Sequence, residues 1–314
     1  MTAVRPSFPV LDASQVAELI PRLDIGSALR QAFLGLASGS SIQPPQTLIL
    51  LDDGADAIVY AAAVQNLGVI AVKTSPYIPS RTPPVTAWTM LMSTQTGEPQ
   101  LLCDSAALTG ERTAATTALA VDLLAPTDAM ALAVVGAGSI AAAHLRHVLS
   151  VRSFAAVKVF SRSLAQGDEA ALARVLGAAP HATVCRSAAE TVHGADVVLL
   201  CTSSGSPVID VADTAPSALI TSISTNKPRA HEISPEALGE LAVYCDYRAT
   251  APVSAGEMVI AQERGPWSPD AIVADLPELV AGKAPPRPEG RAFFRSIGLA
   301  IEDAAVAAAL LRAI

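Results

Sequence analysis

The pattern of apolar and polar positions changes partway along this chain of 314 residues. Apolar side chains recur every three or four positions over residues 14–37, which predicts one or two helices there. Strand-like runs follow without a helical pattern between them, and they cover residues 47–51, 57–63, 69–74, 88–93 and 100–103. Because successive strands joined by short turns pair antiparallel, the first part of the chain is expected to be largely antiparallel.

A second rhythm follows a helix predicted over residues 111–124, which ends before Pro126. Strands and helices then alternate, and residues 292–314 end in a further helix rich in Ala and Leu. The predicted strands are 131–135, 157–160, 195–201 and 219–222, with helices at 139–150 and 168–176. This alternation is typical of a doubly wound parallel sheet. We therefore predict an α/β fold, with a Rossmann-type parallel sheet and a second α+β domain.

The composition limits the functions that the chain can have. Hydrophobic residues make up 51% of the sequence and charged residues 16%, which is enough apolar material for a folded core. The formal net charge is −8, and lysines and arginines do not cluster, which argues against a nucleic-acid partner. The longest mostly apolar run, residues 129–143, is shorter than the roughly 20 residues of a membrane span. No membrane partner is expected.

Four widely separated cysteines without a Cys-x-x-Cys pair fit a reduced, cytoplasmic enzyme better than a disulfide scaffold or a zinc module. The first residues carry no signal-peptide pattern. His144 and His147 lie three residues apart on a predicted helix, but no third ligand is evident, so no metal is expected. The sequence thus points to an enzyme that acts on a small molecule.

The strongest local signal is a glycine-rich loop between a predicted strand and a predicted helix. It reads Gly136-Ala137-Gly138-Ser139-Ile140-Ala141, a G-x-G-x-x-A pattern. Glycine permits the tight turn and the close approach of a pyrophosphate to the backbone, while helix amides face the anion. The alternative is a glycine turn in an ordinary βα unit. The strand–turn–helix context favours dinucleotide binding by Gly136, Gly138, Ser139, Ile140 and Ala141.

The end of the next strand indicates which dinucleotide is bound. An acidic residue there would accept a hydrogen bond from the ribose 2′-hydroxyl of NAD, but this chain has Ser161-Arg162-Ser163. A guanidinium flanked by hydroxyls suits a 2′-phosphate, so NADP(H) is favoured over NAD(H). The alternative is that Arg162 is a solvated charge at a strand end.

Lys73 and Arg112 are candidate anion-binding residues. Lys73 lies in an otherwise apolar strand, where a lysine either reaches the surface or pairs with a buried group. Desolvation would lower its pKa and make it a plausible proton donor. Arg112 is expected in the first turn of a helix capped by Thr109, where a carboxylate would gain from the helix dipole and a bidentate guanidinium. The alternative for Arg112 is an ordinary pairing with a residue four positions away on the helix or elsewhere on the surface.

Taken together, these residues resemble the ornithine cyclodeaminase/mu-crystallin family of NAD(P)-dependent enzymes over nearly the whole chain. The resemblance rests on motifs that occur in a fixed order: Val72-Lys73, the LTGERTAA segment at 108–115, the Gly136 loop, Asn226-Lys227-Pro228 with His231-Glu232, and the 294–298 and 301–303 segments. It implies a homodimer, with a Rossmann dinucleotide-binding domain at 121–292. It also implies a substrate-binding and dimerisation domain formed by residues 1–120 plus 293–314.

The family includes ornithine and lysine cyclodeaminases, alanine dehydrogenase and reductases of cyclic ketimines. The resemblance implies that Lys73 and Arg112 hold the substrate carboxylate and that Thr86 lies on the substrate side. Gln46 stands where the family usually has an arginine. Thr202 and Ser203, at a strand end, and Gly298 are expected to line the cofactor site. For Thr202 and Ser203 the alternative is ordinary packing.

Asn226 is the departure that bears most on the reaction. Ornithine cyclodeaminases have an aspartate there, which can accept the proton of the δ-ammonium before the amine attacks. Asparagine cannot act as a base, although it can orient the substrate or ribose by hydrogen bonds. Reduction of a preformed cyclic imine needs a hydride, a carboxylate clamp and a proton on nitrogen.

We therefore predict a ketimine reductase that converts Δ1-pyrroline-2-carboxylate or Δ1-piperideine-2-carboxylate to proline or pipecolate. Lys73, or a bound water, would protonate the ring nitrogen. Three alternatives stay open: an ornithine cyclodeaminase with its base elsewhere, a non-catalytic NADP-binding protein of the crystallin kind, and an opine-like or alanine dehydrogenase. The last would require free ammonia or an amine.

Overall fold

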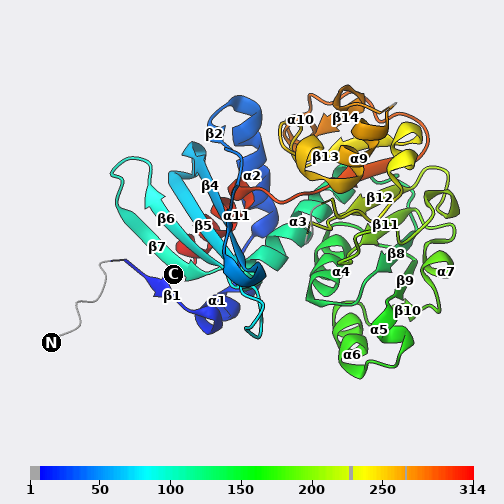
Figure 1. Ribbon diagram of the computed structural model, residues 1–314, viewed down its shortest axis with the longest axis horizontal. Coiled ribbons are helices and arrows are strands. Elements are labelled where there is room, and N and C mark those ends of the chain that lie inside the picture. Colours follow the sequence, from blue (N-terminus) through cyan, green and yellow to red (C-terminus); the bar gives the residue numbers. More distant parts are fainter. Residues whose placement is uncertain (1–7, 226–228, 266) are drawn as a thin grey trace. The chain divides into compact units, whose positions relative to one another are not determined.

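The computed structural model describes residues 8–225, 229–265 and 267–314. These residues form two compact units, each with its own sheet (Figure 1). Unit 1 comprises the chain up to Arg112 together with Leu299–Ile314, and unit 2 comprises Thr113–Gly298. The chain passes from one unit to the other within helix α3, Ala106–Leu124, and again between Gly298 and Leu299.

The sheet of unit 1 has the strand order β1-β7-β6-β5-β4-β2, and β3 also pairs with β4. Strands β2 to β7 pair antiparallel, as the sequence predicts, whereas the short β1 runs parallel to β7. The strands are β1 Val10–Leu11, β2 Ser41–Ile42, β3 Thr47–Leu50, β4 Asp56–Val64, β5 Val69–Tyr77, β6 Trp88–Ser93 and β7 Pro99–Asp104.

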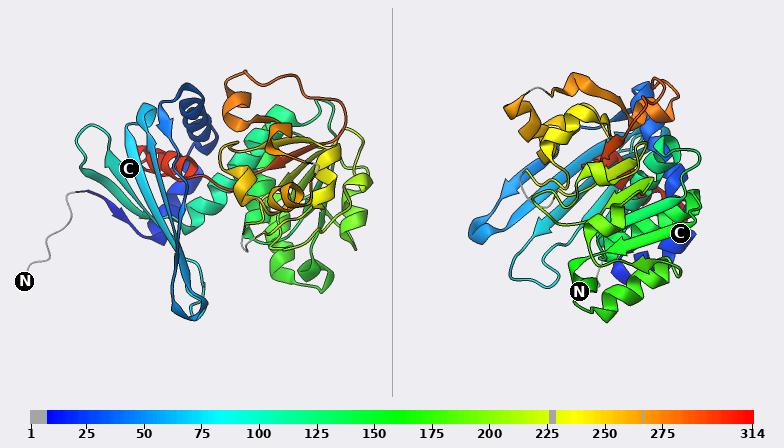
Figure 2. Two further views of the ribbon diagram at one scale, coloured as in Figure 1. Left: turned by 45° about the horizontal axis from the view of Figure 1, so that its top comes forward. Right: turned by 90° about the vertical axis from the view of Figure 1, so that its right-hand side faces the viewer.

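Helices α1 Ala13–Leu19, α2 Ile25–Ser38 and α11 Ala300–Arg312 belong to unit 1. The side chain of Asp24 caps α2, and the left-handed Gly39 ends it. Helix α11 is buried from Ala300 to Leu310, and its many alanines allow close packing on β4, β5 and α2. Figures 1 and 2 show α11, drawn in red, lying against this sheet. Its position brings two acidic residues, Glu302 and Asp303, into the core.

The sheet of unit 2 has the order β10-β9-β8-β11-β12-β15-β13-β14, and every neighbouring pair is parallel. This confirms the predicted doubly wound sheet. The strand order reverses between β8 and β11, which is where such folds bind ligands. The strands are β8 Ala131–Val135, β9 Ala156–Phe160, β10 Thr183–Val184, β11 Val197–Leu200, β12 Leu219–Ser222, β13 Ala242–Cys245, β14 Ile272–Asp275 and β15 Ala292–Arg295.

Helical segments cover this sheet, whose central strands are buried along their whole length. One core cluster joins alternate residues of the sheet to Leu238, Met258 and Trp267. The α-helices of unit 2 after α3 are α4 Ser139–Val151, α5 Arg162–Ala165, α6 Glu169–Ala178, α7 Ala188–Val192, α8 Ala251–Ser254, α9 Gly256–Arg264 and α10 Leu276–Val280. Short 3-10 turns are η1 Ile20–Arg22, η2 Asp52–Gly54, η3 Gln65–Leu67, η4 Val211–Asp213, η5 Pro235–Glu240 and η6 Pro269–Ala271.

The start of α3 differs from the sequence prediction. The helix begins at Ala106 instead of 111, because the Asp104 carboxylate accepts a hydrogen bond from the Ala106 amide at 3.0 Å. Thr109 is therefore inside the helix, and its hydroxyl donates to the Ser105 carbonyl at 2.8 Å. The prediction that Thr109 caps the helix and that Arg112 lies in its first turn was wrong.

In the ranges that the structure describes, we find no helix with the length and apolar character needed to cross a lipid bilayer.

Candidate functional site

Lys73 is buried in the middle of the unit 1 sheet, with only 2% of its surface exposed. Its ammonium donates to Thr109 Oγ1 at 2.8 Å and to Asp303 Oδ1 at 2.9 Å. Tyr60 stands directly opposite on β4, with its ring centroid 5.0 Å from Lys73 Nζ. The ammonium is thus held by α3, α11 and β4, so Lys73 pairs with buried groups and does not reach the surface.

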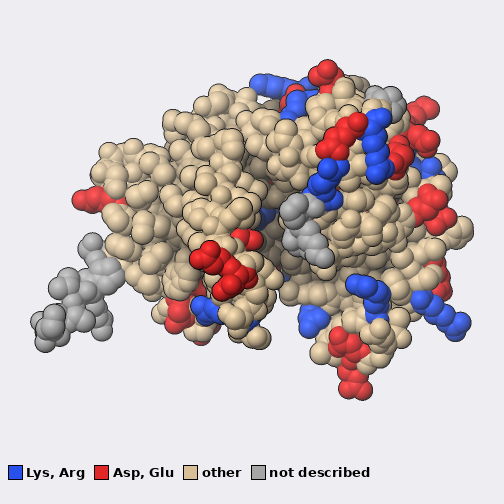
Figure 3. Space-filling view, viewed as in Figure 1, with Lys and Arg blue, Asp and Glu red and all other residues tan. Residues whose placement is uncertain are grey.

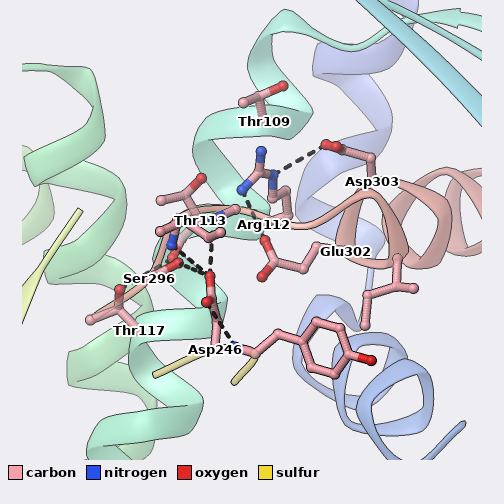
Figure 4. A network of polar contacts seen from close by, with 12 residues as sticks. Thr109, Arg112, Thr113, Thr117, Asp246, Ser296, Glu302 and Asp303 are labelled. Atoms are coloured by element: carbon pink, nitrogen blue, oxygen red, sulfur yellow. Dashed lines mark hydrogen bonds and ion pairs between the residues drawn. The ribbon is translucent and has the colours of Figure 1, made fainter. Parts of the chain in front are cut away.

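Arg112 extends from α3 to two acidic residues of α11, Asp303 and Glu302. Its Nε donates to Asp303 Oδ1 at 3.1 Å, and its Nη1 donates to Glu302 Oε2 at 2.8 Å (Figure 4). Arg112, Glu302 and Asp303 are all almost completely buried. We call Lys73, Arg112, Glu302 and Asp303 the cation cluster; its two positive and two negative side chains balance formally.

The balance of burial and charge sets the protonation of these groups. Burial lowers the pKa of Lys73, while the nearby Asp303 charge opposes that change. Burial alone would also lower the pKa of Arg112, but the charges of Asp303 and Glu302 raise it instead. Burial raises the pKa of Tyr60 and keeps its hydroxyl protonated. Removing one member of a buried ion pair typically costs about 3–5 kcal/mol, so the cluster depends on all of its charges.

The cluster keeps unused hydrogen-bond donors. A lysine ammonium has three N–H groups, and the described partners of Lys73 accept two of them. The Nη2 group of Arg112 has no partner among the described residues, since its bonds start from Nε and Nη1. These donors could bind a carboxylate of a ligand without breaking the existing pairs.

The other predicted substrate residues lie apart from this hydrogen-bond network. Gln46 is exposed just before β3. Thr86 is half-buried, and its backbone amide donates to the Pro76 carbonyl at 3.1 Å. Neither side chain forms a described hydrogen bond with the cluster. Asn226 lies outside the residues that the structure describes.

In unit 2, the glycine-rich loop connects β8 to α4 as predicted. Gly136 has a φ of 132°, and its amide donates to the Phe160 carbonyl at 2.8 Å. A Cβ on Gly136 would lie 2.4 Å from the carbonyl oxygen of Cys201 on the adjacent β11 loop, so no other residue fits without movement. Gly138 is the N-cap of α4 and is exposed with Ser139 and Ile140. Ala141 is buried behind them.

The loop presents the start of a 13-residue helix at the switch point of the sheet. The first amides of such a helix lack partners within the helix and carry the positive end of its dipole. Arg174 of α6 adds a cation, because its Nη1 donates to the Ala137 carbonyl at 2.8 Å. A glycine cradle, free helix amides and a nearby guanidinium fit the pyrophosphate of a dinucleotide.

Strand β9 is the neighbour of β8 in the sheet, so the residues that follow β9 lie next to the glycine-rich loop. Ser161 caps α5 by accepting a hydrogen bond from the Leu164 amide, and its hydroxyl lies 3.0 Å from that of Ser163. Arg162 is exposed, and its guanidinium has no polar partner among the described residues. A free guanidinium between two hydroxyls fits a 2′-phosphate.

Glu232 organises the loops that follow β11 and β12. Its buried carboxylate accepts hydrogen bonds at 2.7 Å from both the amide and the hydroxyl of Thr202. The other oxygen accepts from Ser222 Oγ and from the amides of Ile223 and Ser224, at 2.8–3.2 Å. Five donors therefore converge on one carboxylate. Ser203, next to Thr202, is exposed.

The backbone amide of Gly298 donates a hydrogen bond to a buried carboxylate within unit 2. Asp246 Oδ2 accepts from the amides of Ile297 at 2.6 Å and of Gly298 at 3.0 Å, and from Ser296 Oγ at 3.1 Å (Figure 4). Burial raises the pKa of Asp246 against the effect of these hydrogen bonds. Asp246 thus fixes the segment from which the chain leaves unit 2.

The predicted site residues did not include Glu302, Asp303, Tyr60 or Glu232. Glu302, Asp303 and Glu232 lay within recognised motifs, but their partners are distant in sequence; Lys73 and Asp303 are 230 positions apart. Tyr60 could have been found from the strand register, which places it opposite Lys73.

Comparisons with known proteins agree with the fold of each unit. The sequence pattern of the ornithine cyclodeaminase/mu-crystallin family matches residues 9–312. An NAD(P)H-dependent anabolic L-arginine dehydrogenase of Pseudomonas aeruginosa is 50% identical over 99% of this chain and 98% of its own. The ketimine reductase mu-crystallin of Macropus fuliginosus is 29% identical over 89% of this chain and 88% of its own.

A solved archaeal alanine dehydrogenase dimer with bound NAD has a TM-score of 0.88 and 25% identity to this chain. The alignment covers 98% of this chain and 95% of that one. The agreement extends over both units, and it supports the Rossmann-type assignment of unit 2.

Proposed function

Because the chain belongs to the ornithine cyclodeaminase/mu-crystallin family, we propose that it is an NAD(P)H-dependent dehydrogenase that forms L-arginine from its 2-oxo acid. The observation that carries this proposal is the 50% identity to the Pseudomonas aeruginosa L-arginine dehydrogenase, which extends over 99% of this chain. This substrate differs from the cyclic ketimine that the motifs alone favoured. It falls within the dehydrogenase alternative, which requires free ammonia.

The reaction joins two chemical steps. Ammonia condenses with the ketone of 5-guanidino-2-oxopentanoate and releases water, which gives a 2-imino acid. Addition of a hydride to the imine carbon and of a proton to its nitrogen then gives the amino acid. NAD(P)H supplies the hydride when it is bound.

We assign the carboxylate of this substrate to the unused donors of Lys73 and Arg112. Binding an anion at a buried ammonium and guanidinium gives strong, oriented hydrogen bonds, because little water competes with them. The lowered pKa of Lys73 also makes its ammonium a better proton donor, so Lys73 or a bound water can protonate the nitrogen.

For the cofactor, we assign the pyrophosphate to the loop from Gly136 to Ala141 and favour NADP(H) over NAD(H). The free Arg162 guanidinium, with Ser161 and Ser163 beside it, supports that preference. We place Thr202, Ser203 and Gly298 at the cofactor and keep Gln46, Thr86 and Asn226 as substrate-side residues.

A reductase of cyclic ketimines is the second candidate, favoured by the similarity to the mu-crystallin ketimine reductase. Such a reaction needs the same carboxylate clamp but no ammonia. Ornithine cyclodeamination is less well supported, since Asn226 cannot accept the proton of the δ-ammonium.

We also propose that the protein is a homodimer whose subunits meet through unit 1. Exposed apolar side chains gather on and next to β3: Ile42, Leu48, Ile49, Leu50 and Leu51. Figure 3 shows that much of the visible surface of unit 1 carries no charged side chain. A patch of this kind is typical of a protein interface. Sedimentation equilibrium should give a dimer mass, and Leu50→Glu should give a monomer.

The test of the proposed reaction is the initial rate of NADPH oxidation with a panel of substrates. We expect turnover with 5-guanidino-2-oxopentanoate only when ammonium is present, and a loss of at least tenfold in kcat/KM in Arg112→Ala and Lys73→Ala. Turnover of Δ1-pyrroline-2-carboxylate without ammonium, and none with the oxo acid, would favour the ketimine reductase. Tight NADPH binding without any turnover would favour a binding protein.

A further inference from the structure

Asp303 is the residue of the cation cluster that touches both cations. Its Oδ1 accepts from Lys73 Nζ at 2.9 Å and from Arg112 Nε at 3.1 Å. Glu302 reaches Arg112 by a 2.8 Å ion pair, and no hydrogen bond or ion pair to Lys73 is described for it. Only one oxygen of Asp303 is used, since Oδ2 is buried without a hydrogen-bond partner among the described residues. Asp303 therefore links two cations that come from different elements.

We propose that Asp303 is a positioning residue that fixes Lys73 and Arg112 so that their remaining donors grip a single substrate carboxylate. The inference rests on the proposed function, because it takes the substrate to be a carboxylate bound by these two residues. Asp303 acts through Lys73 and Arg112 and does not need to touch the substrate itself.

The geometry explains why residue 303 must carry a carboxylate. Lysine has a flexible four-carbon stem, and its ammonium is held here by one neutral hydroxyl, one aromatic ring and one charge. Removing the charge leaves Thr109 and Tyr60, which cannot balance a buried cation. Arg112 would keep its ion pair with Glu302, but the contact that fixes its Nε end would no longer be an ion pair.

The charged and titratable groups around Lys73 shift its pKa in opposite directions. Asp303 and Glu302 on α11 favour its charged form, whereas burial and Arg112 on α3 favour the neutral form. Tyr60 on β4 has its own pKa raised by burial and stays neutral. Asp303→Asn removes the largest favourable contribution, so the pKa of Lys73 should fall further.

The titration of Lys73 tests this directly and needs no substrate. The lysines of the chain are Lys73, Lys158, Lys227 and Lys283, so a protein labelled with ¹³C at lysine Cε gives a simple spectrum. Lys73→Met identifies the resonance of Lys73. In Asp303→Asn we expect its midpoint to fall by at least about one pH unit, as typical for the loss of a close counter-charge.

Glu302→Gln is the matched control, since it also removes one negative charge from the cluster but has no described bond to Lys73. It should move the Lys73 midpoint by less than half of the shift in Asp303→Asn. With the full-length enzyme, Asp303→Asn should raise KM for 5-guanidino-2-oxopentanoate at least tenfold, and the alkaline limb of its pH profile should move to lower pH. KM for NADPH should change less than twofold.

Asp303→Glu keeps the charge and should restore part of the affinity for the oxo acid. An unchanged Lys73 midpoint in folded Asp303→Asn would overturn the proposal, as would equal effects of Asp303→Asn and Glu302→Gln. If Asp303→Asn does not fold, Asp303→Ser takes its place, and an unchanged Lys73 midpoint in that variant would overturn the proposal. If the wild-type enzyme does not use the oxo acid, the proposed function fails, but the Lys73 titration still decides the role of Asp303.

Discussion

Gly136 and Gly138 lie in the same loop, yet alanine at each position should have different consequences. Gly136 has a φ of 132°, a conformation that costs a side chain about 1–3 kcal/mol. An alanine Cβ would also lie 2.4 Å from the carbonyl oxygen of Cys201, and relieving such overpacking costs about 1–3 kcal/mol more. Gly136→Ala should therefore destabilise the protein by about 2–6 kcal/mol.

Gly138 is the matched control for this prediction. Its φ is −74°, and a Cβ there would have no heavy atom within 4 Å. Only the preference of a helix N-cap for glycine over alanine opposes the change, at a cost below about 1 kcal/mol. However, the methyl group would stand where the pyrophosphate must approach the backbone, so Gly138→Ala should raise the Kd for NADPH at least tenfold.

Urea unfolding followed by circular dichroism measures the stability of each variant, and NADPH fluorescence measures its binding. The expected pattern is a large loss of stability for Gly136→Ala and a loss of binding with near-normal stability for Gly138→Ala. Equal stabilities of the two variants would refute the assignment of the Gly136–Cys201 contact. Normal NADPH binding by Gly138→Ala would refute the assignment of the pyrophosphate to this loop.

Three further predictions concern single residues of both units. Arg162→Ala should raise the Kd for NADPH at least tenfold and that for NADH less than twofold, measured by fluorescence titration; equal losses would contradict a role at the 2′-phosphate. Glu232→Gln should lower the free energy of unfolding by about 1–3 kcal/mol, because an amide cannot accept all five hydrogen bonds, and an unchanged urea midpoint would argue against the network. Burial raises the pKa of Cys103 to about 12 from an ordinary value of 9.0. The pKa of this thiol is higher in the folded state than in the unfolded state, so the stability contributed by the neutral thiol should be lost as the pH rises above 9 towards 12. At pH 8.5, Cys103 should resist alkylation by iodoacetamide until the protein unfolds, and peptide mass mapping checks this.

The parts of the site that could be predicted from sequence are those set by neighbouring residues. The loop from Gly136 to Ala141 combines a buried strand, two glycines and a helix start within a few positions, and the structure has this arrangement. Five of the seven strands of unit 1 were also evident, because their apolar runs are bounded by turn residues, whereas the two-residue strands β1 and β2 were not predicted. Local patterns carry this information because backbone conformation and face exposure are local properties.

The remaining features depend on the tertiary fold. Strands β13, β14 and β15 have four residues each and were not predicted from the sequence. The start of α3 was misplaced because Thr109 was taken as the cap, whereas Asp104, the last residue of β7, accepts the hydrogen bond of the Ala106 amide. The pairing of Asp303 with Lys73 follows only once α11 lies across the sheet.

The central claim is that this protein adds ammonia-derived nitrogen and a hydride to the oxo acid of arginine. The most direct test is to incubate the enzyme with NADPH, 5-guanidino-2-oxopentanoate and ¹⁵N-ammonium, and to determine the mass and chirality of the product. We predict L-arginine one mass unit heavier than the natural compound, with the label at the α-nitrogen. No labelled arginine, with NADPH consumed instead on Δ1-pyrroline-2-carboxylate to give unlabelled proline, would contradict the claim.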